Sequence, residues 1–165
     1  MIRFASTRTP EGEKATELIL SVFRVNGLML GAGDLLAAEH GLTSARWQVL
    51  GAIALAQRPL TVPQIARRMG LTRQSVHTTI HRLVAGELVE FVSNADHRRS
   101  QLVRLTERGR AKFQAIDGKQ AAWVNRLAAG LARSDLDTAA RVLAELCTRL
   151  EADPTPATRP ERKRS

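Results

Sequence analysis

Apolar residues recur at helical spacing along most of the chain, and turn-forming residues divide this pattern into segments. From residue 11 to about residue 40 the apolar positions fall mostly three or four apart, which predicts one long helix. Glycines interrupt its second half, so we expect a bend or a break near Gly31 to Gly33. A second helix is predicted over residues 43–56, with a wide apolar face made of Trp47, Leu50, Ile53 and Ala54.

Two further helices are predicted on either side of a glycine. Thr61 supplies an N-cap and Gln64 stands at the capping-box position, which predicts a short helix to about residue 69. Gly70 is expected to end this helix, and a longer one should run from about residue 72 to residue 86. The apolar residues expected to bury the joint between them are Ile65, Ala66, Met69, Leu71, Val76, Ile80 and Leu83.

A hairpin and two helices complete the pattern. The β-prone runs 88–92 and 101–105 flank the polar stretch 93–99, which predicts a two-stranded ribbon with a charged tip. Helices are then expected over residues 106–131 and from residue 134 to about residue 150. A short helix, a glycine turn, a longer helix and a hairpin form the pattern of a winged helix-turn-helix. The predicted fold class is therefore mainly α, with a two-stranded β wing.

Positive charge is concentrated in the segment that carries this pattern. The 165 residues include 25 Lys and Arg against 16 Asp and Glu, a formal net charge of +9. Residues 42–105 hold nine arginines, no lysine and three acids. The planar guanidinium suits phosphate oxygens and guanine edges, so this segment is expected to bind a polyanion.

The second helix of the predicted pair has a polar face without an acid. No Asp or Glu occurs between Met69 and Gly86, so nothing there repels a phosphate backbone. Arg and Gln can bind guanine or adenine edges, and Ser and Thr can reach base or phosphate. The major-groove candidates are Arg73, Gln74, Ser75, His77 and Thr78, and the phosphate candidates are Arg67 and Arg82.

The hairpin tip supplies a second candidate contact. Arg98 and Arg99 would lie at the end of the ribbon, from which an arginine can enter the adjacent minor groove. Asp96 could orient a neighbouring arginine by a charge-assisted hydrogen bond.

Other functions are less favoured by the sequence. No Ser-His-Asp order, Gly-rich phosphate loop or paired-carboxylate signature is found, so we expect neither an enzyme nor a cofactor. Uninterrupted apolar runs are too short for a membrane span, and the first residues do not read as a secretory signal. With a single cysteine, Cys147, the cytoplasm is the expected compartment. Tyrosine is absent and aromatic residues are 4%, which disfavours single-strand binding by base stacking.

Three alternatives stay open. His77 and His81 are four residues apart, a spacing that can hold a metal, but no third ligand is evident and DNA contact explains them better. Cys147 could sense oxidants, although its place beside an apolar stripe favours a packing role. The basic segment could also belong to an architectural protein that coats DNA with little sequence preference.

The ordered series of motifs resembles the multiple-antibiotic-resistance regulator (MarR) family over about residues 15–150. The motifs that carry the resemblance are Leu42-Thr43, Trp47-Gln48-Val49-Leu50, Leu60-Thr61, Ile65 to Met69, Leu71 to Val76, Leu83, Leu88, Asp96 to Arg99, Leu102-Val103 and Leu105 to Gly109. One departure lies in the wing. The family's Asp-x-Arg triplet falls on His97-Arg98-Arg99 here, with Asp96 one residue early, so which arginine enters the minor groove stays open.

The resemblance implies a homodimeric transcriptional regulator whose first and last helices interlock. Its two recognition helices would read a pseudo-palindromic operator in duplex DNA, and a small aromatic or phenolic ligand would often relieve repression. Ligand candidates, chosen by their place between the dimerisation and DNA-binding regions, are Met29, His40 and Trp47. The implied organisation is a mobile N-terminus at 1–10, a dimerisation helix at 11–41, a DNA-binding domain at 42–105, dimerisation helices at 106–152 and a disordered basic tail at 153–165.

Overall fold

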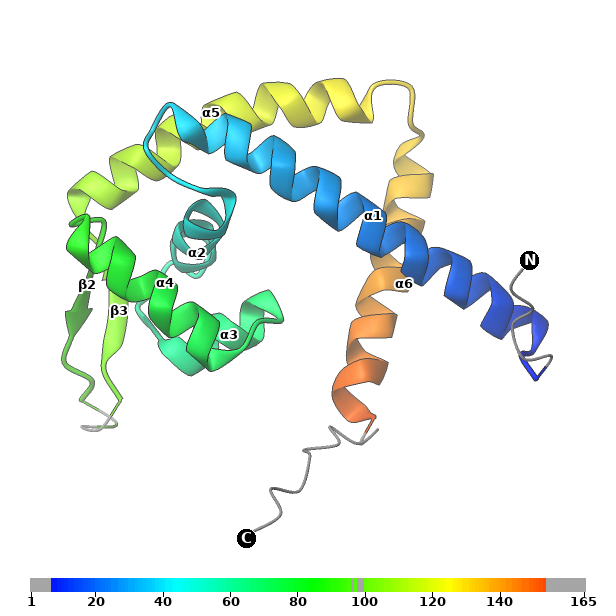
Figure 1. Ribbon diagram of the computed structural model, residues 1–165, viewed down its shortest axis with the longest axis horizontal. Coiled ribbons are helices and arrows are strands. Elements are labelled where there is room, and N and C mark those ends of the chain that lie inside the picture. The colour runs from blue at the N-terminus through cyan, green and yellow to red at the C-terminus, as the bar shows by residue number, and fades with distance from the viewer. Residues whose placement is uncertain (1–6, 96, 98–99, 154–165) are drawn as a thin grey trace, which may run out of the picture. The chain divides into compact units, whose positions relative to one another are not determined.

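The computed structural model describes residues 7–95, 97 and 100–153, in two compact units (Figure 1). The first unit extends to Trp123 and the second begins at Val124. The elements of the first are α1 (Pro10–Ala38), α2 (Ser44–Ala54), β1 (Leu60–Thr61), α3 (Val62–Met69), α4 (Arg73–Ala85), β2 (Val89–Val92), β3 (Leu102–Leu105) and the greater part of α5 (Glu107–Ala128). The second unit holds the end of α5 and all of α6 (Arg133–Ala152). The mainly helical winged fold is confirmed.

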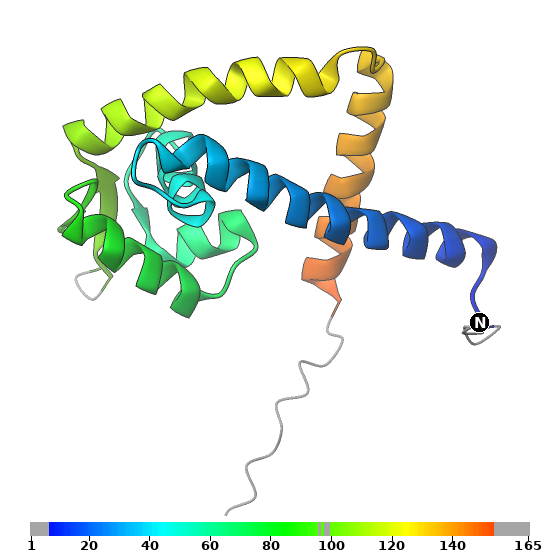
Figure 2. The same cartoon turned by 45° about the horizontal axis from the view of Figure 1, so that its top comes forward.

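The long first helix continues without the expected break (Figure 2). Thr9 caps its N-terminus by accepting the Gly12 N–H, with Pro10 in the first turn. A Cβ at Gly31 would meet open space, whereas one at Gly33 would lie 2.6 Å from Ser44 Oγ. The absence of a side chain at Gly33 therefore allows α1 to approach α2 closely. The expected break was wrong, because this glycine is used for packing and the helix continues through it.

Local signals set the two short helices as predicted. The capping box of Thr61 and Gln64 is present at the start of α3, and Gly70 ends that helix in the left-handed conformation with φ 62°. Thr72 caps α4 by accepting the Ser75 N–H. Val76, Ile80 and Leu83 are fully buried, as is Ile65 of α3. Leu71 is 45% exposed, so its expected place in the joint was wrong. Its backbone N–H bonds the Ala66 carbonyl, and that turn leaves its side chain outside.

The wing contains three strands and not the two expected. The order is β1-β3-β2, with antiparallel pairing throughout. Leu60 of β1 pairs with Val103, and Phe91 of β2 pairs with the same residue from the other side. Because β1 has only two residues, it shows no alternating pattern and the sequence alone does not predict it.

A junction at Leu88 joins α4, the wing and α5. The Leu88 N–H donates to the Leu83 carbonyl at 2.9 Å, and the Leu88 carbonyl accepts the Thr106 N–H at 3.1 Å. Thr106 also donates its hydroxyl to the Glu87 carbonyl and caps α5 by accepting the Gly109 N–H. A Cβ at Gly109 would overlap the Leu88 carbonyl oxygen, so only glycine fits there.

Apolar side chains remain uncovered on the terminal helices. No residue of α6 is buried. In each unit, taken alone, large hydrophobic residues are exposed: Ile19, Leu20, Val22, Phe23, Val25, Leu28, Met29, Leu30 and Leu35 on α1, and Leu136, Val142, Leu143 and Leu150 on α6.

By length and composition alone, α1 could cross a membrane. It has 29 residues and contains an 18-residue window with a mean hydropathy of 1.4. Uninterrupted apolar runs do not reveal this helix, because polar residues interrupt its apolar ones. Its C-terminal half packs within the first unit, where Gly33 and Ala37 are buried and Asp34 Oδ1 accepts the Ser44 N–H at 2.6 Å.

Substituting Gly109 tests the junction. Gly109→Ala places a methyl group against the Leu88 carbonyl, so we expect it to lower the free energy of unfolding by about 1–3 kcal/mol. Gly118→Ala is the matched control on the same helix, because a Cβ there meets nothing within 4 Å. Better helix propensity should make that change neutral or stabilising by up to about 1 kcal/mol. Urea denaturation of both variants measures the difference, and equal effects would contradict the assignment.

Candidate DNA interface and ligand cavity

The exposed face of α4 gathers the residues predicted to meet the major groove. Val76, Ile80 and Leu83 anchor the helix in the core, and this fixes which side faces outward. On that outward side the structure exposes Arg73, Gln74, Ser75, His77, Thr78, His81 and Arg82. Thr78 donates its hydroxyl to the Gln74 carbonyl at 3.1 Å, so its oxygen keeps lone pairs for a donor such as adenine N6.

Two histidines on this face contact each other. The Nε2 atoms of His77 and His81 are 3.1 Å apart, and the ring centroids are 4.3 Å apart. The His81 ring also lies 5.8 Å, centroid to centroid, from the Phe91 ring of β2. The pair therefore lies where the helix face meets the wing.

Further arginines flank α4. Arg67 and Arg68 are exposed in the last turn of α3, where positive charge also suits the helix dipole. In the wing, Arg104 is held by Glu90 across the strands at 2.7 Å. Asp96, Arg98 and Arg99 lie outside the described residues. Near the tip, Asn94 Nδ2 donates to the Ser100 carbonyl at 2.9 Å and closes the base of the loop.

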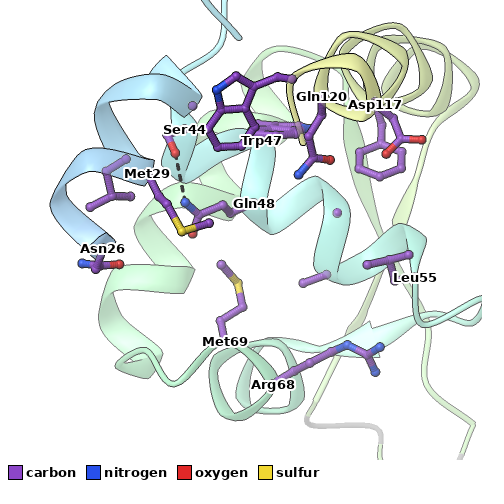
Figure 3. A pocket seen from close by; sticks show the side chains of 16 residues that line it. Asn26, Met29, Ser44, Trp47, Gln48, Leu55, Arg68, Met69, Asp117 and Gln120 are labelled. Atoms are coloured by element: carbon purple, nitrogen blue, oxygen red, sulfur yellow. Dashed lines mark hydrogen bonds between the residues drawn. The ribbon is translucent and has the colours of Figure 1, made fainter. Parts of the chain in front are cut away.

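A cavity of about 480 Å³ lies within the first unit, between α1, α2, the end of α3 and α5 (Figure 3). Met29 and Trp47, two of the three predicted ligand residues, line it, but His40 is not among its lining residues. The other lining residues, which sequence reasoning missed, are Asn26, Leu30, Gly33, Ser44, Gln48, Gly51, Ala52, Leu55, Arg68, Met69, Phe113, Asp117, Gln120 and Trp123. They come from four helices, and no periodicity in the sequence indicates that these helices meet.

The cavity wall combines an apolar surface with a few polar groups. Met29, Gln48 and Met69 point toward its centre from three different helices (Figure 3). Ser44 Oγ accepts a hydrogen bond from Gln48 Nε2 at 2.9 Å, which orients the amide. The buried Trp47 Nε1 and His40 Nε2 have no hydrogen-bond partner within the described part of the chain. A cavity of this size and lining suits one small organic molecule.

An ion pair joins the end of α1 to α5, two of the helices that line this cavity. Lys119 of α5 donates a hydrogen bond to the carboxylate of Glu39, which directly follows α1. That hydrogen bond and the positive charge of Lys119 lower the pKa of the Glu39 carboxyl below its ordinary value.

The remaining candidate chemistry finds little support in the described residues. No group of three or more His, Cys, Asp and Glu side chains is placed to share a metal there. Cys147 is exposed on α6 in the chain taken alone, so its expected packing role would need a covering partner.

The fold and the helix face define a winged helix-turn-helix DNA-binding protein, and comparison with known proteins gives its family. A family model described as "MarR family" matches residues 40–100. An uncharacterised protein of Mycobacterium tuberculosis is 39% identical over 141 residues, which cover 86% of this chain and 97% of that protein.

Solved structures share the fold. A MarR family transcriptional regulator from Silicibacter pomeroyi superposes with a TM-score of 0.76 at 20% identity, over 92% of this chain and 100% of its own. The regulator NadR in complex with 4-hydroxyphenylacetate superposes with a TM-score of 0.73 at 16% identity, over 89% and 98%.

The chain belongs to the MarR family of winged-helix transcriptional regulators. It is a DNA-binding regulator and not an enzyme. Members of this family bind DNA as dimers, and some bind small aromatic ligands.

The Glu39–Lys119 pair predicts a pH-dependent difference in stability. Because the folded pKa of Glu39 is lowered, its contribution is present above about pH 4.3, the ordinary value of an unfolded glutamate, and is lost as pH falls through the folded value. Glu39→Gln should therefore lower Tm slightly at pH 7, and this gap should narrow progressively as the pH falls below about 4.3. Glu151→Gln, at an exposed position on α6, is the control. A gap that stays the same size as the pH falls below about 4.3 would contradict the ion-pair explanation.

Proposed function

We propose that the protein is a homodimeric repressor that binds a pseudo-palindromic operator and is released by a small aromatic or phenolic ligand. The observation that carries the DNA part is the exposed face of α4, which is rich in Arg, Gln, His and hydroxyl groups and has no acid. On this proposal the base-edge contacts come from Arg73, Gln74, Ser75, His77 and Thr78.

Phosphate contacts would surround these base contacts. Arg67 in the last turn of α3 and Arg82 in the last turn of α4 are both exposed. Wing contacts are assigned to Arg98 and Arg99, with Asp96 orienting one of them. Arg104, by contrast, is engaged by Glu90 and is left out of the proposed contacts.

Dimerisation would cover the exposed apolar faces of α1 and α6. Phe23 at 67% exposure and Leu35 at 79% are large hydrophobic side chains left in water by the single chain. A second copy offers the same faces, which suits a two-fold interface. An interface between two copies also explains why α1 is hydrophobic without requiring a membrane. Gly33 and Ala37 of this helix are buried in the domain, and Asp34 accepts a hydrogen bond from it. We therefore place the protein in the cytoplasm.

Ligand control would act through the end of α3. Arg68 and Met69 line the cavity and directly precede Gly70, the turn that leads into α4. A molecule in the cavity therefore contacts the segment that orients the proposed recognition helix. The phenol bound by the structural relative NadR supports an aromatic ligand, and the apolar wall with Gln48 and Gln120 suits a ring carrying polar substituents.

A pair of substitutions separates base reading from phosphate attraction. Gln74→Ala should weaken binding to a duplex selected from a random pool by about 1–3 kcal/mol and leave a scrambled duplex unaffected. Arg67→Ala should weaken both duplexes alike and reduce the salt slope by about one. Fluorescence anisotropy at two salt concentrations measures this, with Arg133→Ala on α6 as the control.

The outcome also distinguishes the architectural alternative. A specific regulator should prefer the selected duplex by roughly 10³-fold or more. A wild-type ratio near one, with both affinities falling together as salt rises, would favour a protein that coats DNA.

Intrinsic fluorescence tests the cavity. The chain has two tryptophans, and both Trp47 and Trp123 line the cavity. Saturating 4-hydroxyphenylacetate should quench Trp47→Phe and Trp123→Phe alike, because the remaining indole lies beside the ligand in each. The ligand should also weaken operator binding, typically by about 5–150-fold, and the operator should weaken ligand binding by the same factor. Quenching of only one variant, or quenching without a loss of DNA affinity, would contradict the proposal.

A further inference from the structure

We propose that His77 and His81 form a two-histidine site for a divalent transition-metal ion on the outward face of α4. The first observation is that the Nε2 atoms of the two rings face each other. The Nε2 atoms are 3.1 Å apart while the ring centroids are 4.3 Å apart, so the rings converge at these nitrogens. Neighbouring histidines at this helical spacing share one side of the helix.

The separation of the two nitrogens matches the bite of a chelate. Zinc-to-histidine bonds are about 2.0–2.1 Å long, and two such bonds across the observed 3.1 Å enclose an angle of about 100°. That angle lies between those of octahedral and tetrahedral coordination. A cation could therefore take the place of the shared hydrogen, which moves by way of solvent to Nδ1 of the same ring so that both Nε2 lone pairs are free to bind.

The surroundings determine which metals fit. No acid lies on α4, and Arg73 is one turn before His77, so this helix offers imidazole nitrogens and no negatively charged ligand. Neutral imidazole suits Cu²⁺, Ni²⁺ and Zn²⁺, whereas Mg²⁺ and Ca²⁺ require oxygen ligands. The described residues supply no third ligand, so water or an added donor would complete the coordination. The Phe91 ring lies 5.8 Å from the His81 ring, centroid to centroid, so an apolar side chain borders the site.

Metal binding has a consequence for DNA, which rests on the proposed function. A His77 chelated through Nε2 no longer offers that nitrogen to a base edge and keeps only its Nδ1–H as a donor. The added positive charge still attracts phosphate, however. We therefore expect the ion to lower the ratio of specific to nonspecific DNA affinity and not to abolish DNA binding.

The site is tested first without DNA, by calorimetric titration of the full chain with Cu²⁺ and with Zn²⁺. Cys147→Ser serves as the background, so that no thiol competes. His77→Gln and His81→Gln should each weaken binding by about tenfold or more, because two linked ligands bind far better than one. His97→Gln, which changes an exposed histidine between β2 and β3, should leave affinity unchanged. The metal should raise Tm in the background protein and in His97→Gln only.

Two results would overturn the site. Equal affinity in all three variants would place the ion elsewhere, and loss in only one of His77→Gln and His81→Gln would indicate a single-histidine ligand. Both α4 positions are exposed, so circular dichroism should confirm that the variants fold.

The DNA arm then compares selected and scrambled duplexes with and without Zn²⁺. On addition of Zn²⁺ the affinity ratio should fall in the background protein and stay constant in His81→Gln, which removes one metal ligand and keeps the proposed base contact of His77. An unchanged ratio with a metal bound would contradict the coupling alone. A ratio near one without any metal would contradict the proposed function and leave the site standing.

Discussion

The packing of the Leu88 backbone between α4 and α5 is the constraint on which the arrangement of the DNA-binding elements depends. The amide of Leu88 closes the end of α4, and its carbonyl receives the Thr106 N–H at the start of α5. Gly109 allows α5 to lie directly on that carbonyl. Three parts of the structure therefore share one residue: the proposed recognition helix α4, the strand that begins the wing and the helix that leaves the domain.

A second constraint runs through α2. On one side Trp47, Gln48 and Gly51 form part of the cavity wall, and on the other Leu50 belongs to the buried cluster that also holds Val76 and Ile80 of α4. Because a core packed to crystal density transmits displacements, a change in cavity content can reach α4 through α2 as well as through the end of α3. Asp34 adds a fixed point, since its carboxylate holds the first turn of α2 to α1.

Features that depend on neighbouring residues in the chain could be predicted, and features that depend on distant ones could not. The capping box of Thr61 and the left-handed Gly70 follow from local chemistry, so α3 and α4 were placed correctly. The outward face of α4 followed from its periodicity. In contrast, β1 forms because Leu60 pairs with Val103, which is distant in the sequence. The role of Gly33 in close helix packing likewise depends on Ser44 of the next helix. The cavity residues Arg68, Asp117 and Gln120 gave no signal because four helices must first be assembled. The mutual contact of His77 and His81 required rotamers, which spacing alone does not give.

The exposed apolar faces of α1 and α6 also have a consequence for how operator occupancy depends on the concentration of the protein. If a second chain must cover Phe23 and Leu35 before two copies of α4 can reach one operator, occupancy at low concentration rises with the square of the amount of chain. A twofold change in synthesis would then produce up to a fourfold change in bound operator. The same hydrophobic surface that completes the fold would in this way sharpen the threshold at which the gene is switched.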